Sequence, residues 1–410
     1  MSYKSIAGYV SLATIVALFL FLVPHTFERQ AEIRPTQSDF DGAMVAERRT
    51  GEAGRNIRWA AGDSVVPILK QDRGVKPPMY PVVLHYAYKA GVKNLQLVNA
   101  TFFAIILLLM WLTARSLMPA YGVMALMLFA VLFEPFYINF AAFRAEGLFM
   151  IASFMTMYAT ERYWLRPDWP GLLLIAGSLA LLCFTRYFGL FWLLPLSGLI
   201  ILIRHYNEPL KAILRGGVAG FLAIVPAGLF MLDQYVATGY LTGIDRFSTR
   251  YMEGDRVPID AVSDFFMVVA TDFSPASYEP FYWLVGSQLA LWVGLPVFIL
   301  MAVAFFMAMF RRLPAGAIDV VKGSTDRTVL RGTLVAIYAL SYMVCVTTLW
   351  AFGNNDPLWS RFLLPMYPFM LITLAAACST PPLWSGWRRL IILGIYAMAI
   401  VFQLWELYDM

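Results

Sequence analysis

The sequence predicts an all-α polytopic membrane protein, and three observations support this fold class. Of its 410 residues, 60% are hydrophobic and only 14% are charged, whereas soluble domains carry about 25% charged residues. Apolar runs of about 20 residues recur along nearly the whole chain, and each is long enough to cross a bilayer as a helix. Basic residues cluster in short linkers between these runs, as expected for cytoplasmic flanks. We therefore expect a single transmembrane domain over residues 1–410, with about 11 spans.

The first part of the chain contains a span followed by a long polar interruption. Ile6–Val23 resembles the apolar region of a signal peptide, but it is longer, and no small-residue cleavage site follows it. We interpret it as a membrane span with Lys4 on the cytoplasmic side. Residues 25–96 then form a first outer loop, in which the amphipathic run Ala43–Thr50 predicts a juxtamembrane helix.

The remaining apolar runs complete the predicted topology. The further spans are expected at Leu97–Ala114, Tyr121–Asn139, Gly147–Thr160, Leu172–Phe184, Phe188–Ile203, Gly217–Leu232, Tyr282–Phe310, Leu334–Phe352, Phe362–Cys378 and Leu390–Leu404. A second outer loop is expected over residues 233–280. The linkers assigned to the cytoplasm contain basic residues, among them Arg204, Lys211, Arg215, Arg327 and Arg331.

Composition also limits the function. The cysteines Cys183, Cys345 and Cys378 lie in apolar runs without the short spacing of a metal or redox motif. The three histidines are scattered, so a histidine-built metal site is not expected. Basic flanks account for the net charge of +5. Nucleic acid is therefore not an expected partner.

Two carboxylates, Asp39 and Asp41, stand two residues apart in the first outer loop. Ser38 and Asp41 match a capping box, and on that interpretation both acids only complement a helix dipole. A carboxylate fixed at a helix start beside the membrane, with one oxygen facing a cavity, also suits a general base. The spacing alone leaves both interpretations open.

A second polar cluster, Arg144 and Glu146, stands where the fourth span enters the membrane. Ionisable groups at membrane depth are costly unless they are paired or hydrated, so they are typical of functional positions. Positions i and i+2 point apart on a helix, and we therefore expect the two side chains to have different partners. The alternative is a pair that extends to the membrane surface from a helix end.

Arg186 and Arg361 are isolated cations at the predicted outer ends of spans. Orientation in the membrane does not require positive charge on that side. The planar, permanently charged guanidinium suits phosphate oxygens, so both residues are candidates for binding a lipid phosphate. The alternative is simple anchoring at the membrane interface.

Taken in order along the chain, these motifs resemble the GT-C superfamily of integral membrane glycosyltransferases. The branch concerned includes protein O-mannosyltransferases and bacterial lipid A aminoarabinose transferases. The resemblance covers most of the chain. It depends on Asp39 and Asp41, Pro77-Pro78-x-Tyr80-Pro81, Arg144-x-Glu146, Thr185-Arg186 and Arg361-Phe362-Leu363-Leu364-Pro365.

The resemblance implies an inverting transferase that takes a sugar from a polyprenyl-phosphate carrier on the extracytoplasmic face of the plasma (inner) membrane. Asp39 would be the catalytic base, Asp41 the alternative base or its helper, and Glu146 would orient the substrate. The candidates for binding lipid phosphate or substrate are Arg144, Arg186, Arg361, Tyr80, Arg246 and Arg250. We expect no cofactor, or a divalent cation held by Asp39, Asp41 and Glu146. The metal-free site is favoured.

The sequence departs from the family pattern in two places. Members often carry Asp-Glu with a tyrosine shortly after it, whereas Asp39-Phe40-Asp41-Gly42 is followed by Ala43-Met44, which leaves the identity of the base open. Many members also have a soluble C-terminal domain, whereas this chain stops at Met410, just past its last predicted span. We therefore expect a lipid-linked or small glycan acceptor.

Two other classes of protein fit part of the pattern. An O-antigen ligase or polymerase would concentrate charge in a late outer loop, and residues 233–280 contain Arg246, Arg250 and Glu253. A lipid or glycan flippase would also need many spans and membrane-embedded charges. Transporters usually place polar groups near the membrane midplane and often contain an internal repeat. The sequence shows no repeat, and its charges cluster on one face.

Overall fold

The computed structural model of the chain describes residues 77–141, 144–241, 326–352 and 360–379, with a few single residues in 13–23 and 265–272. In these segments helix is the only regular secondary structure. The helices are α4 (Met79–Lys89), α5 (Gln96–Ala114), α6 (Ala120–Leu132), α7 (Glu134–Ala141), α8 (Glu146–Leu165), α9 (Trp169–Thr185), α10 (Phe188–Phe191), α11 (Leu193–Arg204), α12 (Pro209–Thr238), α15 (Arg327–Phe352), α16 (Ser360–Leu363) and α17 (Tyr367–Ser379).

Three of these helices are long and apolar enough to cross a membrane, namely α5, α12 and the part of α15 from Arg327 to Leu349. Several shorter apolar helices accompany them. Large apolar side chains also remain on the outside of the bundle, and Leu210, Phe221 and Val236 are 81%, 69% and 79% exposed. Extensive apolar exposure is a liability in water but not in lipid. The described part of the chain is thus consistent with an all-α membrane protein.

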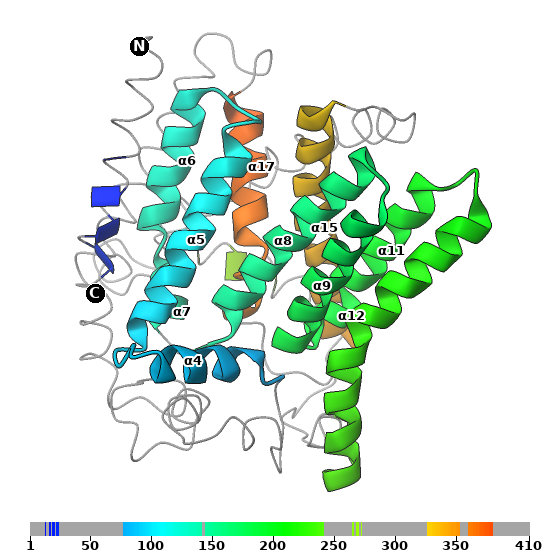
Figure 1. The fold of residues 1–410 in the computed structure, drawn as a ribbon. Helices are drawn as coiled ribbons and strands as arrows, with labels where there is room; N and C mark the ends of the chain where they lie inside the picture. Colours follow the sequence, from blue (N-terminus) through cyan, green and yellow to red (C-terminus); the bar gives the residue numbers. More distant parts are fainter. Residues whose placement is uncertain are drawn as a thin grey trace.

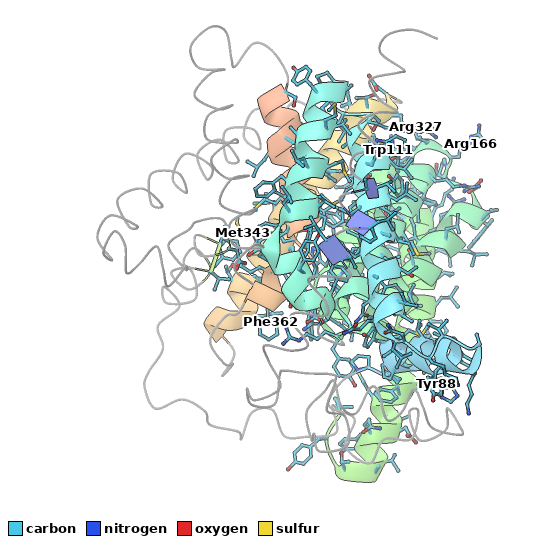
Figure 2. All side chains as sticks on the ribbon, turned by 90° about the vertical axis from the view of Figure 1, so that its left-hand side faces the viewer. Tyr88, Trp111, Arg166, Arg327, Met343 and Phe362 are labelled. Carbon is cyan, nitrogen blue, oxygen red and sulfur yellow. The ribbon has the colours of Figure 1, made fainter. Side chains whose placement is uncertain are left out.

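The long helices run side by side, and α4 lies across one end of the bundle (Figure 1). The junctions α7–α8 and α9–α10 lie at this same end, which we call the α4 end. The turns α8–α9 and α11–α12 and the start of α15 lie at the opposite end. Figure 2 shows Phe362 and Tyr88 toward the α4 end and Arg166 and Arg327 toward the other. The described segments that were predicted to be outer loops therefore share one end.

Three predicted spans are broken in the structure, and this corrects the sequence analysis. Each was expected to be one continuous helix, but the breaks separate α6 from α7, α10 from α11 and α16 from α17. Pro135, Pro195 and Pro365 stand at or just after these breaks. Proline has no N–H for the helix ladder and disfavours helical geometry in the preceding residue. Hydropathy alone did not reveal these interruptions.

Side chains satisfy backbone carbonyls that the breaks expose. Pro135 cannot donate to the Val131 carbonyl, and the Tyr137 hydroxyl donates to that oxygen instead. At the α10–α11 break, the Cys345 thiol donates to the Phe191 carbonyl at 3.4 Å. Non-helical backbone at membrane depth requires such partners, because no water is available there.

The α16–α17 break follows the same rule. The Met366 N–H donates to the Leu363 carbonyl, as in a tighter turn, and not to the Phe362 carbonyl. The Tyr342 hydroxyl from α15 donates to the Phe362 oxygen. The broken helix is therefore fastened to α15 near the α4 end.

Several helices extend beyond the spans that the sequence predicted, α12 and α15 most of all. Helix α12 includes Lys211 and Arg215, which were assigned to a linker, and it continues through Asp233 into the predicted second outer loop. It ends at Gly239, whose φ of +79° favours glycine. Helix α15 begins at Arg327 and not at Leu334. Charged residues ended the apolar patterns, but they did not end the helices.

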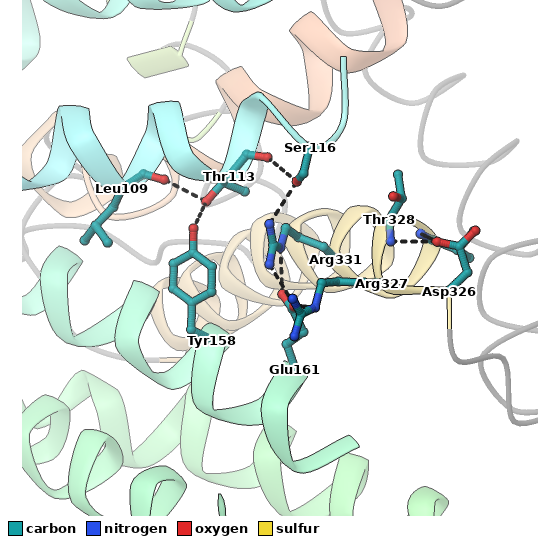
Figure 3. A network of polar contacts seen from close by, with 10 residues as sticks. Leu109, Thr113, Ser116, Tyr158, Glu161, Asp326, Arg327, Thr328 and Arg331 are labelled. Atoms are coloured by element: carbon teal, nitrogen blue, oxygen red, sulfur yellow. Dashed lines mark hydrogen bonds and ion pairs between the residues drawn. The ribbon is translucent and has the colours of Figure 1, made fainter. Parts of the chain in front are cut away.

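A polar network joins α5, α8 and α15 at the end opposite α4 (Figure 3). Arg331 donates to both carboxylate oxygens of buried Glu161 at 2.7 Å, and Arg327 Nε lies 3.1 Å from Glu161 Oε1. Arg331 Nη1 also donates to Ser116 Oγ at 3.0 Å. A buried carboxylate is tolerated only with such partners, so the network favours one alignment of these three helices.

The carbonyl bonds at the helix breaks can be tested with Tyr137→Phe. Loss of the hydroxyl leaves the Val131 carbonyl buried without its donor, and we expect the free energy of unfolding to fall by about 1–3 kcal/mol. Reversible unfolding of the purified protein by SDS in mixed micelles measures this. Tyr206→Phe, at a residue that is 67% exposed, is the matched control and should change little. Equal stability of the two variants would contradict the proposed role of Tyr137.

Candidate functional site

The candidate site lies at the α4 end, where an acid and an arginine meet. Glu146 begins α8, and Arg186 directly follows α9. Arg186 Nη1 donates to Glu146 Oε1 at 2.6 Å. The two side chains are 20% and 6% exposed, respectively. The structure thus joins two residues that the sequence analysis assigned to separate tasks.

The local structure favours each charge where it stands. Glu146 lies in the first turn of α8, where the helix dipole stabilises negative charge, and Arg186 caps the C-terminus of α9, where it stabilises positive charge. The chain then turns sharply into α10. A side chain at Gly189 would place its Cβ 2.7 Å from Leu182 Cδ2, so glycine allows α10 to fold back closely on α9.

Aromatic side chains lie beside the ion pair. The guanidinium carbon of Arg186 lies 5.8 Å from the ring centre of Phe362. Nearby, Tyr342 packs edge-on against Trp192, with ring centres 4.6 Å apart, and lies 4.8 Å from Phe188. Such apolar surroundings have a low dielectric constant, which strengthens the attraction between Glu146 and Arg186. They would also strengthen the attraction of Arg186 for an anionic ligand.

Arg144 has a different partner from Glu146, as the i, i+2 spacing predicted. Its Nη1 donates to Asn139 Oδ1 at 3.0 Å, and Asn139 Nδ2 donates to the Pro135 carbonyl at 2.8 Å. Arg144 therefore helps to fasten the start of α8 to α7. It lies two residues from the ion pair along the chain.

Arg361 also lies in this part of the bundle. Its backbone belongs to α16, and its neighbour Phe362 contacts Arg186. Helix α16 packs against α7 and α15. Of the two predicted phosphate-binding arginines, the structure therefore places one in the ion pair and the other in the short helix beside it.

Tyr80 holds helices together in the structure, and its expected role in substrate binding stays a prediction. It is only 1% exposed, and its hydroxyl donates to Asn99 Oδ1 at 2.8 Å. This bond joins α4 to α5, and α4 also contacts α9. The tyrosine therefore helps to hold α4 across the end of the bundle.

Several predicted site residues lie outside the described residues. These are Asp39, Asp41, Arg246 and Arg250. The described segments contain no group of three or more histidine, cysteine, aspartate or glutamate side chains that would hold a metal ion. The predicted divalent cation depends on both aspartates together with Glu146, so it stays a prediction.

A further acidic contact, and the tyrosine that makes it, were not predicted from the sequence. The fully buried Tyr367, at the start of α17, donates its hydroxyl to the carboxylate of Asp272. A signal was present, since Asp272 follows the apolar run Val268-Val269-Ala270. An acid in such a run marks a position that needs a partner.

Fold and site together are those of a helical bundle with three helices that could cross a membrane and a buried acid–arginine pair at one end. The sequence matches no protein-family model, and a search of curated proteins finds no match.

The ion pair can be tested with a double-mutant cycle. Glu146→Gln and Arg186→Gln each break the buried ion pair, and we expect each to lower the free energy of unfolding by about 3 kcal/mol. The double variant should lose clearly less than the sum, because the second substitution removes a charge whose bond to the first residue is already lost. Unfolding by SDS in mixed micelles measures all three variants.

Arg162→Gln provides the matched control for this cycle. Arg162 pairs with Asp168 at 3.0 Å, but both side chains are about 40% exposed. Exposed ion pairs contribute about 1 kcal/mol or less. Additive losses in the Glu146–Arg186 cycle, or single losses as small as that of the control, would show that the pair is not a coupled buried unit.

Proposed function

We propose that the protein is a GT-C-type glycosyltransferase with about 11 spans. It would move a sugar from a polyprenyl-phosphate carrier to a lipid-linked or small glycan acceptor on the outer face of the inner membrane. The observation that carries the proposal is the Glu146–Arg186 ion pair, joined at 2.6 Å among aromatic side chains at the α4 end. A charged pair at membrane depth is costly to keep, and this favours a functional role.

Arg186 is suited to bind the carrier phosphate. A guanidinium has five N–H donors in a planar fork, so it can hold a carboxylate and still donate to a phosphate. Glu146 would keep this fork in a fixed orientation and balance its charge before the carrier arrives. Arg361 in the neighbouring α16 would supply a second positive charge.

The reaction would be a single displacement at the anomeric carbon. Asp39 would accept the proton of the acceptor hydroxyl, with Asp41 as the alternative base. The acceptor oxygen then forms the new bond to the anomeric carbon from the face opposite the phosphate, and the old bond to the phosphate oxygen breaks. The electron pair leaves with the polyprenyl phosphate, whose negative charge Arg186 and Arg361 would stabilise. The stereochemistry at that carbon is inverted.

This chemistry needs no metal in the proposed site. Phosphate is already a good leaving group, and the two arginines would compensate its developing charge. The aromatic wall of Phe188, Trp192 and Tyr342 would keep water away and strengthen these interactions. Asp39, Asp41 and Glu146 form the alternative site for a divalent cation.

The described ion pairs do not favour the transporter interpretation. A transporter usually carries its polar groups near the membrane midplane. Here Glu146–Arg186 lies at one end of the bundle, and Glu161–Arg331 lies at the other. The ligase or polymerase interpretation depends on Arg246 and Arg250, and the assay below separates it from the transferase.

A transfer assay on the purified protein in liposomes tests the proposal. A panel of polyprenyl-phosphate sugars is offered with lipid-linked glycan acceptors, and sugar transfer and carrier binding are measured separately. We expect the wild-type protein to transfer one sugar residue to each acceptor molecule. Asp39→Asn should reduce the rate by about 100-fold or more while carrier binding persists. Arg186→Gln should weaken carrier binding, as should Arg361→Ala.

Arg115→Gln is the matched control, because Arg115 is an exposed arginine at the end of α5 remote from α4. It should leave both measurements unchanged. Retained turnover in Asp39→Asn would reject this residue as the base. Transfer of whole glycan chains would favour the ligase or polymerase, and carrier movement across the bilayer without sugar transfer would favour the flippase.

A further inference from the structure

A dense group of cations surrounds the α8–α9 turn, at the end of the bundle opposite the candidate active site. Two carboxylates, Asp168 and Glu208, lie among these cations. The cations come from α8, the turn itself, α11 and α12, and we call them the turn cluster: Arg162, Arg166, Arg204, Lys211 and Arg215. The transferase proposal assigns no role to any of these residues.

Each carboxylate is already committed to one cation. Arg162 donates to both oxygens of Asp168 at 3.0 and 3.3 Å, and together with the Gly171 N–H it lowers the pKa of this carboxyl. Lys211 lies 2.8 Å from Glu208 and lowers the pKa of that carboxyl too. Both acids are therefore ionised at neutral pH, and each balances one neighbour. The remaining arginines have no counter-charge in the cluster.

The other side chain that could carry charge here, His205, adds no positive charge at neutral pH. Its Nε2 lies 2.9 Å from the Tyr163 hydroxyl and 3.3 Å from Arg215 Nη1. Burial and the nearby Arg215 lower the pKa of His205, so the ring is neutral at pH 7. The net positive charge of the cluster comes from its five cations, which outnumber the two carboxylates.

Two of the uncompensated arginines bind backbone carbonyls at the end of α8 through one guanidinium nitrogen each. Arg204 Nε donates to the Trp164 carbonyl at 2.9 Å, and Arg215 Nη1 donates to the Pro167 carbonyl at 2.6 Å. These carbonyls are only three residues apart, so both guanidinium groups meet at the same turn. Their other nitrogens make no hydrogen bond to the described part of the chain. Each arginine is thus fixed in place with N–H donors available.

Arg166 lies between those two carbonyls in the sequence. It is exposed, and its side chain makes no hydrogen bond or ion pair with the residues that the structure describes. Figure 2 shows it at the margin of the molecule, at the end remote from Phe362. Arg166, Arg204 and Arg215 therefore gather around one turn with unused donors.

Aromatic and apolar side chains continue from this charged turn along the bundle. Trp169 is 50% exposed, and its ring centre lies 5.7 Å from the guanidinium carbon of Arg215. Tryptophan in this position is typical of the membrane interface. Along α9, α11 and α12 the next large apolar side chains are exposed: Leu173, Leu174, Leu202, Leu210, Ile213 and Leu214. Positive charge thus borders directly on an apolar flank.

We propose that the turn cluster binds an anionic phospholipid of the phosphatidylglycerol type. Arg166, Arg204 and Arg215 donate to its phosphate oxygens, and its acyl chains lie along the exposed leucines of α9 and α12. The adjoining apolar flank favours a lipid over free phosphate, because only a lipid also covers that flank. The net positive charge favours an anionic headgroup over a zwitterionic one. This inference is independent of the transferase proposal.

Native mass spectrometry of the full chain, released from detergent with added lipid, tests the site. Wild type should bind phosphatidylglycerol more tightly than phosphatidylethanolamine of the same chain length. Arg166→Gln should weaken phosphatidylglycerol binding about fivefold, the effect of one basic residue near a headgroup. The variant should fold normally because Arg166 makes no described side-chain contact, and its unfolding curve checks this.

Two further variants make the result specific. Arg115→Gln removes one exposed arginine at the same end of the bundle, and it should leave phosphatidylglycerol binding unchanged. Arg204→Lys keeps the charge but loses the planar fork, and it should weaken binding in the same direction as Arg166→Gln.

Three results would overturn the proposal. Equal affinity of the wild-type protein for the two lipids would show that the positive charge of the turn cluster does not select an anionic headgroup. Equal losses in Arg115→Gln and Arg166→Gln would show that general surface charge, and not this turn, attracts the lipid. Displacement of the lipid by millimolar inorganic phosphate would identify the ligand as free phosphate.

Discussion

The ion pair between Glu146 and Arg186 is the interaction on which the proposed active site depends. Each residue stands at the end of its own helix, on the side where the helix dipole stabilises its charge. The pair forms only if α8 and α9 pack antiparallel with their ends level, as they do here (Figure 1). A pair held at 2.6 Å with little exposure also restricts the elements that surround it, namely the turn into α10 and the short α16.

The broken helices belong to the same arrangement. At membrane depth an exposed carbonyl needs a donor, and side chains supply one at each of the three breaks. Two of these breaks, α10–α11 and α16–α17, adjoin the ion pair. The Tyr342 hydroxyl caps the α16 break, while the Tyr342 ring packs against Trp192. Irregular backbone, aromatic packing and paired charge thus occur together at the α4 end. At the opposite end, the Glu161–Arg331 ion pair joins two uninterrupted helices, α8 and α15.

The sequence predicted the helical class and the existence of the described apolar helices, because a long apolar run has few alternatives in a membrane. It also singled out Glu146 and Arg186, since isolated charges beside apolar runs are conspicuous. It did not predict that these two would pair, because that depends on the alignment of two helix ends 40 residues apart. The breaks were not predicted because hydropathy reports how apolar a segment is and not whether each residue has a backbone N–H. The prolines at the breaks were nevertheless present in the sequence. The sequence motif also did not show that Tyr80 is buried and bonded to Asn99, because burial cannot be inferred from a motif.

A structure of the protein bound to a non-transferable polyprenyl-phosphate sugar would test the central claim most directly. We predict that the phosphate lies at the α4 end, within about 3 Å of the Arg186 guanidinium nitrogens. The Glu146 carboxylate should remain in contact with the same arginine. A phosphate bound at the opposite end of the bundle, or away from Arg186 at the α4 end, would contradict the proposed site.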